Sequence, residues 1–111
     1  MDVVRPQQLR VNKNQRVRYI APPVKSGIYF IQAATGTGLI KIGYSNDCEA
    51  RLRSMQTGSP IQLTLLAVLP GSRKREQQVH RYWSVYRAHG EWFQPDTRLL
   101  AEIAQIQACT T

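Results

Sequence analysis

Two short apolar runs in the first half of the chain have the length and composition of β-strands. They span Gly27–Gln32 and Leu39–Gly43, and the segment between them, Thr35-Gly36-Thr37-Gly38, predicts a hairpin turn. If residue 31 pairs with residue 39, Tyr29 lies opposite Lys41. That face of the hairpin then carries a phenol and an amine, while the other face carries four apolar side chains: Ile28, Phe30, Ile40 and Ile42.

A helical period replaces the strand pattern after residue 45 and predicts a helix there. The helix follows three residues that are typical of N-caps: Ser45, Asn46 and Asp47. Asn46 together with Glu49 fits a capping box. Three apolar residues form the inward stripe of the helix: Cys48, Leu52 and Met55. Arg51 borders this stripe, Arg53 points away from it, and Gly58 is expected to end the helix in the left-handed conformation.

The second half of the chain predicts one more strand and two more helices. Ile61–Leu69 is an apolar run between prolines, which is typical of a central buried strand. Arg73–Ala88 is expected to be a helix that ends before Gly90, with its inward stripe formed by Val79, Tyr82 or Trp83, and Tyr86. A last helix begins at Pro95-Asp96-Thr97, and four of its residues are expected to face inward: Leu99, Leu100, Ile103 and Ile106.

The charge of the chain indicates a polyanionic partner. The 111 residues are enough for one domain, and 15 Lys and Arg against 7 Asp and Glu give a formal net charge of +8. Such a balance favours nucleic acid, although a ribosomal or merely soluble basic protein has the same composition. Residues 1–25 hold only one carboxylate, Asp2, against six cations: Arg5, Arg10, Lys13, Arg16, Arg18 and Lys25.

Two interpretations of residues 1–25 stay open. The segment is rich in Gln and Asn and ends in Pro22-Pro23, so we expect an extended arm rather than part of the core. It is either a disordered tail or a basic arm that contacts phosphates. Residues 26–111 form the predicted folded domain.

The sequence predicts a cytoplasmic protein without a membrane span. No run approaches the ~18 apolar residues of a transmembrane helix, and the N-terminal segment lacks the apolar stretch of a secretory signal. The two cysteines, Cys48 and Cys109, are too few for a disulfide framework and are expected to be free thiols.

Six residues form the candidate set for chemistry: Tyr29, Lys41, Arg51, Glu76, His80 and Glu91. Each alone has an ordinary structural explanation, such as a solvated i,i+4 pair for Glu76 and His80. No CxxC or HxxxH spacing predicts a zinc site, and no G-x-S-x-G elbow predicts a serine nucleophile. Taken together, the six suit cleavage of a phosphodiester, which needs a base for water, a cation near the phosphate and a metal at the leaving oxygen.

The residue types suggest how the roles divide. Tyr29 or Lys41 can take or relay a proton from water if nearby positive charge lowers its pKa. Arg51 can hold the phosphate with two hydrogen bonds, and Arg53 adds a further nucleic-acid contact. Glu76 can bind Mg²⁺ or Mn²⁺, which prefer oxygen ligands and keep several waters.

The chain resembles the GIY-YIG nuclease superfamily, in particular its compact phage- and bacteria-type branch. That branch has K-I-G where the name-giving motif has Y-I-G. The resemblance covers residues 26 to about 105 and rests on six motifs in order: Gly27-Ile28-Tyr29, Lys41-Ile42-Gly43, Arg51-Leu52, Gln56-Thr57-Gly58-Ser59-Pro60, Glu76-x-x-x-His80 and Gly90-Glu91-Trp92-Phe93.

The resemblance implies an α+β fold and metal-dependent DNA cleavage. The fold would be a three-stranded antiparallel sheet flanked by helices, in the order β-β-α-β-α-α. By the family pattern Tyr29 helps to activate water, Arg51 contacts the scissile phosphate and Glu76 holds Mg²⁺ or Mn²⁺. His80 belongs to the branch pattern and either orients Glu76 or assists proton transfer, while the role of Glu91 stays open.

Two alternatives to an endonuclease remain at this stage. One is a catalytically weak nucleic-acid-binding module of the same fold. The other is a phage or bacterial accessory domain that binds protein through Trp83 and Trp92. The sequence predicts DNA as the partner, leaves RNA open and does not fix the oligomeric state.

Overall fold

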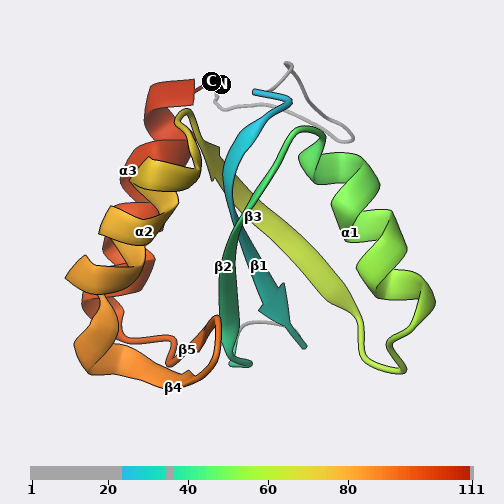
Figure 1. The fold of residues 1–111 in the computed structure, drawn as a ribbon. Coiled ribbons are helices and arrows are strands. Elements are labelled where there is room, and N and C mark those ends of the chain that lie inside the picture. Colours follow the sequence, from blue (N-terminus) through green and yellow to red (C-terminus); the bar gives the residue numbers. More distant parts are fainter. Residues whose placement is uncertain (1–23, 35–36, 111) are drawn as a thin grey trace, which may run out of the picture.

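The computed structural model describes residues 24–34 and 37–110, and in this part of the chain five antiparallel strands form one sheet. The sheet order is β3-β1-β2-β5-β4 (Figure 1). The elements in chain order are β1 Gly27–Ala33, β2 Ile40–Ser45, α1 Cys48–Thr57, β3 Leu63–Leu69, α2 Arg73–Tyr82, a 3₁₀ turn Ser84–Tyr86, β4 Arg87–His89, β5 Trp92–Phe93 and α3 Thr97–Thr110. The α+β class is confirmed, whereas the expected three strands and their order β-β-α-β-α-α are wrong.

The two additional strands are too short to leave a periodic signal in the sequence. β4 has only three residues, all of them exposed, and β5 has only two; the turn between them contains Gly90 at a φ of +55°. A left-handed φ of this size favours glycine, which accounts for the break predicted at that position. β5 pairs with β2 and thereby places the β4–β5 turn beside the first hairpin.

Helices cover both faces of the sheet and divide the core in two. Figure 1 shows α2 and α3 on one face and α1 on the other. The α2–α3 side is apolar and includes the fully buried residues Ile28, Phe30, Ile40, Ile42, Phe93 and Leu99. The α1 side is a smaller cluster formed by Tyr29, Ile31, Cys48, Leu63 and Val68. The predicted alternation of faces along the first hairpin is confirmed.

The hairpin register differs from the expected one by two residues. Tyr29 lies opposite Gly43, and Lys41 lies opposite Ile31. A shift of two keeps every side chain on its face, so Tyr29 and Lys41 still share the α1 side of the sheet. The register also explains Gly43, because a Cβ at this position would lie 2.4 Å from the Tyr29 hydroxyl. The tyrosine ring therefore occupies the space that any other residue would fill.

The third strand is an edge strand of the described sheet, not a central one. β1 is the central strand of the first three, since it pairs with both β2 and β3. β3 keeps its apolar sequence because α1 packs against one of its faces and α3 against the other. A continuous apolar run therefore indicates a strand that is covered by helices on both faces, and an edge strand can be covered in this way as well as a central one.

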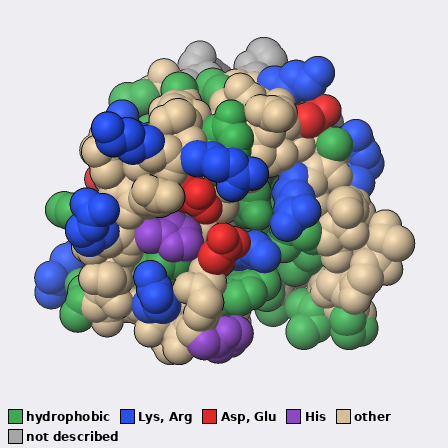
Figure 2. Space-filling model, in the orientation of Figure 1, with side chains coloured by type: hydrophobic (Ala, Val, Ile, Leu, Met, Phe, Trp, Pro, Cys, Tyr) green, Lys and Arg blue, Asp and Glu red, His purple; other side chains and the backbone are tan. Residues whose placement is uncertain are grey.

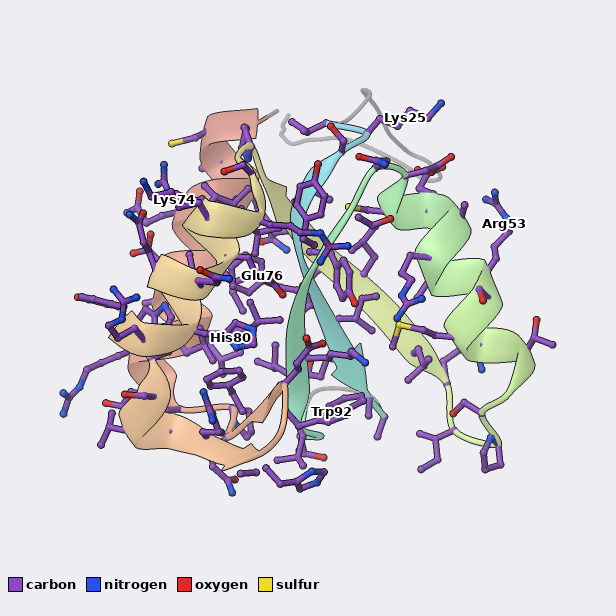
Figure 3. All side chains as sticks on the ribbon, in the orientation of Figure 1. Lys25, Arg53, Lys74, Glu76, His80 and Trp92 are labelled. Atoms are coloured by element: carbon purple, nitrogen blue, oxygen red, sulfur yellow. The ribbon has the colours of Figure 1, made fainter. Side chains whose placement is uncertain are left out.

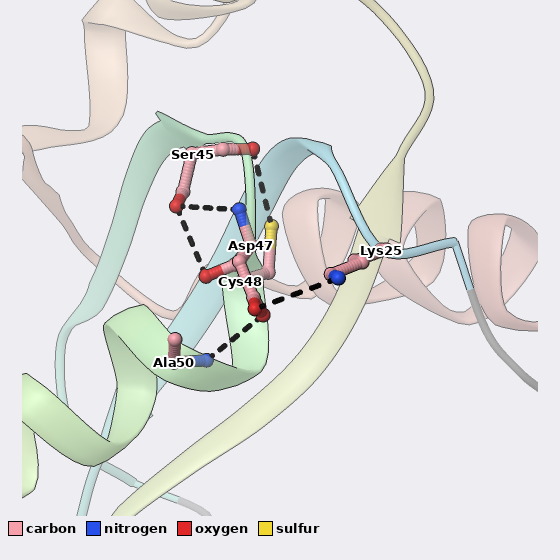
Figure 4. Close-up of polar contacts among 5 residues, drawn as sticks. All are labelled: Lys25, Ser45, Asp47, Cys48 and Ala50. Carbon is pink, nitrogen blue, oxygen red and sulfur yellow. Dashed lines mark hydrogen bonds and ion pairs between the residues drawn. The ribbon is translucent and has the colours of Figure 1, made fainter.

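The cap of α1 is Asp47, and the predicted capping box is wrong. The Asp47 carboxylate accepts a hydrogen bond from the Ala50 backbone N–H at 3.1 Å, and its second oxygen lies 3.9 Å from Lys25 Nζ (Figure 4). Asn46 instead accepts a hydrogen bond from the Tyr44 hydroxyl. The predicted apolar stripe is confirmed, with Cys48 buried and its two partners half-buried against the same cluster. Gly58 ends the helix at a φ of −96°, so it is not left-handed.

α2 is shorter than predicted, and α3 matches its prediction. α2 ends at Tyr82, and Trp83 turns into the core while Tyr82 stays 76% exposed. The chain then leaves the helical path because Tyr86 accepts a backbone hydrogen bond from Gln94, next to β5. In α3 the expected inward residues are buried or packed against the core: Leu99, Leu100, Ile103 and Ile106. None of the described helices is both long and apolar enough to span a bilayer.

Replacing Gly43 by alanine is expected to destabilise the fold. The new methyl group meets the Tyr29 ring, so Gly43→Ala should lower the free energy of unfolding by about 1–3 kcal/mol, measured by chemical denaturation. Gly58→Ala is the matched control, because its Cβ would meet nothing closer than 4.0 Å. The control should change stability by less than about 1 kcal/mol. Equal effects at the two sites would contradict the close packing of Tyr29 on Gly43.

Candidate functional site

All six predicted site residues lie in one connected group. They come from β1, β2, α1, α2 and the β4–β5 turn, and Figure 3 shows the side chains of Glu76 and His80 pointing from α2 toward the sheet. The group contains an acidic part on the α2 side and a phenol–guanidinium pair on the α1 side. Lys41, from β2, contacts the acidic part through Glu91, and the charges of Glu76 and Glu91 act on the Tyr29 hydroxyl.

The acidic part consists of Glu76, His80 and Glu91. One ligand atom from each of these side chains lies within 4.8 Å of the other two. Glu76 is 9% exposed, and its carboxylate lies 3.7 Å from His80 Nε2 in the i,i+4 pair that the sequence predicts. Glu91, whose role the sequence left open, thus belongs to the same cluster. Its position depends on the pairing of β5 with β2, which gave no sequence signal.

The histidine is held by the backbone of β2. His80 Nε2 lies 2.6 Å from the carbonyl oxygen of Ile42, and the ring makes an edge contact with Phe93 at 5.1 Å. A carbonyl oxygen only accepts hydrogen bonds, so Nε2 carries the proton and donates a hydrogen bond to the Ile42 carbonyl. That nitrogen is not free to bind a metal, and the acidic part therefore offers oxygen rather than this nitrogen as its donor. Carboxylate oxygens suit Mg²⁺ or Mn²⁺.

Lys41 is placed by an ion pair and an aromatic ring. Its Nζ lies 3.7 Å from Glu91 Oε1 and 5.7 Å from the centre of the Trp92 ring, and its side chain is only 19% exposed. The backbone fixes both partners, because Lys41 pairs with Trp92 in the sheet and the Ile42 N–H donates to the Glu91 carbonyl at 3.0 Å. The ammonium group is thus oriented toward the acidic part.

Tyr29 is buried and hydrogen-bonded to the side chain of Arg51. Burial raises the pKa of the Tyr29 hydroxyl above its ordinary value of 10.0, and the carboxylates of Glu91 and Glu76 act in the same direction. The hydrogen bond and the charge of Arg51 oppose this increase but do not outweigh burial. Positive charge from Arg51 thus lowers the Tyr29 pKa, but burial outweighs it, so the condition for Tyr29 to act as a base is not met by Arg51 alone.

Cations surround the acidic part on the same face of the molecule. Figure 2 shows the Asp, Glu and His surface near the middle of the view with Lys and Arg side chains on several sides. Arg73 stacks over the Tyr44 ring at 5.2 Å, a pair that the sequence did not reveal because its members are 29 positions apart. Arg53 points outward from α1, as predicted (Figure 3). The other proposed nucleic-acid contacts lie outside the described residues: Arg5, Arg10, Lys13, Arg16 and Arg18.

A profile of the T5orf172 domain matches residues 26–110. The chain belongs to the T5orf172 domain family. The match includes every residue of the acidic part, together with Tyr29, Lys41 and Arg51, so the T5orf172 domain contains the whole candidate site. No curated protein gives a significant match, and neither does any solved structure.

The tyrosine in this T5orf172 domain is expected to ionise only above pH 10. The ¹³Cζ resonance of Tyr29, assigned with a Tyr29→Phe variant, should keep its neutral shift through its ordinary pKa of 10.0. Arg51→Met removes a hydrogen bond and a charge that lower the pKa, so titration should move to still higher pH. The folded-state pKa of Tyr29 is higher than its unfolded-state pKa. The contribution of Tyr29 to the free energy of unfolding is therefore complete below pH 10 and is lost as the pH rises through the folded-state pKa.

The control for this titration is Arg53→Met on the outer side of α1. It removes the same charge from the same helix, yet Arg53 points away from the phenol (Figure 3). Its Tyr29 titration should match that of the wild type. A Tyr29 resonance that titrates below pH 10, or that moves down in Arg51→Met, would contradict the assigned environment.

Proposed function

We propose that this T5orf172 domain protein is a divalent-metal-dependent endonuclease of the GIY-YIG type that hydrolyses DNA phosphodiester bonds. The observation that carries the proposal is the convergence of Glu76, His80 and Glu91 within 4.8 Å, beside Lys41 and the Tyr29–Arg51 pair. A carboxylate cluster on a protein of net charge +8 is a local departure from its surface character. T5orf172 domains are often nuclease-like, which supports the same function.

Arg51 and Lys41 are the proposed phosphate ligands. Arg51 is exposed and interacts with the Tyr29 hydroxyl, and its guanidinium has N–H groups enough to donate to two phosphate oxygens as well. Lys41 supplies a second positive charge from the neighbouring strand. Together they would orient an incoming phosphodiester over the acidic part and stabilise the charge that develops during in-line attack.

Glu76 is the proposed metal ligand. It is buried at the base of the acidic part, and its donor atoms are the hard oxygens that Mg²⁺ and Mn²⁺ prefer. When bound, such a cation supplies positive charge next to the scissile phosphate. His80 donates to the Ile42 carbonyl and lies beside the Glu76 carboxylate, so its proposed role is to position Glu76 rather than to take a proton through Nε2.

Tyr29 is proposed to handle the proton of the attacking water as a hydrogen-bonding phenol. Its neutral hydroxyl can accept a hydrogen bond from water while Arg51 donates to it, and an added divalent cation would favour the phenolate further. The near-complete burial of Tyr29 is also the one observation that favours the second candidate function, a nucleic-acid-binding module that cleaves weakly. A protein-binding domain that uses Trp83 is disfavoured, because Trp83 is part of the core.

The endonuclease proposal predicts plasmid nicking that depends on Glu76 and Arg51. Wild-type protein incubated with supercoiled plasmid and Mg²⁺ or Mn²⁺ should produce open circles. Arg51→Ala should slow nicking by at least roughly a hundredfold, because it removes a phosphate ligand present in the transition state. Glu76→Gln keeps the side-chain shape but removes the charge that holds the metal, and it should be similarly inactive. Agarose gels of time courses measure both rates.

Two exposed residues provide the matched controls. Lys74→Ala removes a cation from α2 that points away from the site (Figure 3), and Glu102→Gln neutralises an exposed carboxylate on α3. Both should nick at close to the wild-type rate. Wild-type nicking no faster than that of Glu76→Gln would reject the endonuclease, and salt-sensitive DNA binding without nicking would then establish the binding module.

A further inference from the structure

We infer that Glu91 is a second carboxylate ligand of the divalent cation and that the ammonium group of Lys41 competes with the cation for it. The inference rests on the proposed function, since it concerns the same site. It goes further because it gives Glu91 a role and makes the binding of metal and the availability of Lys41 depend on each other.

The distances place Glu91 close to a bridging position. Its ligand atom lies within 4.8 Å of those of Glu76 and His80, which is close enough for one Mg²⁺ ion to be held by both carboxylates. Glu76 is fixed on α2 and buried, whereas the Glu91 side chain is 47% exposed and can rotate. Rotation of the exposed Glu91 carboxylate toward Glu76 would therefore complete a two-carboxylate site.

The repulsion between the carboxylates of Glu76 and Glu91 also favours a cation at this site. Two carboxylates this close repel each other unless a cation lies near them, and Lys41 is such a cation, 3.7 Å from Glu91 Oε1. Lys41 therefore holds one of the two carboxylates that a divalent cation would bind. Removing the ammonium group should make the site a better metal ligand, and removing the carboxylate should make it a worse one.

Lys41 has an alternative partner when the metal takes Glu91. The Trp92 ring lies 5.7 Å from Nζ, and the pairing of Lys41 with Trp92 in the sheet keeps that ring beside the side chain. The freed ammonium group therefore stays at the site and can donate to a phosphate. Metal binding thereby converts Lys41 from an ion-pair partner into a substrate ligand, which predicts that metal binding increases its affinity for an anionic substrate.

Calorimetric titration of Mn²⁺ into the 111-residue protein tests this competition without any substrate. Glu91→Gln should weaken Mn²⁺ binding by at least roughly tenfold, which is the scale of losses at metal sites. Lys41→Met, which keeps the aliphatic part of the side chain, should strengthen binding. In the double variant the Lys41→Met gain should vanish, because the carboxylate for which the two cations compete is gone. Thermal melts of each variant verify that the fold is kept.

Glu102→Gln on α3 is the matched control for a general loss of one negative charge, and it should bind Mn²⁺ as the wild type does. The inference is overturned if Glu91→Gln binds Mn²⁺ as tightly as the wild type, or if Lys41→Met has the same effect with and without Glu91. If Glu76→Gln abolishes Mn²⁺ binding and Glu91→Gln leaves it intact, Glu91 is rejected as a metal ligand while Glu76 is kept.

Nicking assays separate this inference from the proposed function. A wild type that binds Mn²⁺ with the predicted Glu91 and Lys41 dependence but never nicks plasmid would uphold the inference and reject the endonuclease. A wild type that nicks while Glu91→Gln binds Mn²⁺ normally would do the reverse. Failure of the wild type to bind Mn²⁺ in the presence and absence of DNA would reject both.

Discussion

The backbone N–H and C=O groups of a single residue, Ile42 in β2, hold the candidate site together. The Ile42 N–H donates to the Glu91 carbonyl, and the Ile42 carbonyl accepts from His80 Nε2, while the Ile42 side chain is fully buried in the core. One residue of β2 thus fixes the β4–β5 turn and the helix that carries Glu76. If either bond were lost, the carboxylates would no longer be held at their present separation.

The three residues of the Lys41-Ile42-Gly43 motif have three different physical roles. Lys41 pairs with Glu91, Ile42 connects α2 and the β4–β5 turn to the sheet, and Gly43 leaves room for the Tyr29 ring. This division explains why the motif combines a charged, an apolar and a minimal residue. It also explains how the β1–β2 hairpin can carry the phenol of Tyr29 and the amine of Lys41, since Gly43 has no side chain that would take the place of the phenol.

The parts of the structure that periodicity determines were predictable, and the parts that depend on distant pairing were not. The faces of the hairpin and the inward residues of α1 and α3 follow from local spacing, so they are confirmed. The predicted hairpin register was wrong because the contact between Tyr29 and Gly43, and not the length of the turn, fixes how β1 pairs with β2. β4 and β5 were missed because they have too few residues, and the pairing of Glu91 with Lys41 was missed with them.

The proposed endonuclease requires that the acidic part bind a metal beside a phosphate-binding pair. The most direct measurement is anomalous diffraction from crystals of the metal-free protein soaked in Mn²⁺. One strong Mn²⁺ peak is expected in contact with the Glu76 carboxylate. Saturating Mn²⁺ that leaves Glu76 without a peak, or that binds only at other carboxylates of the surface, would contradict it.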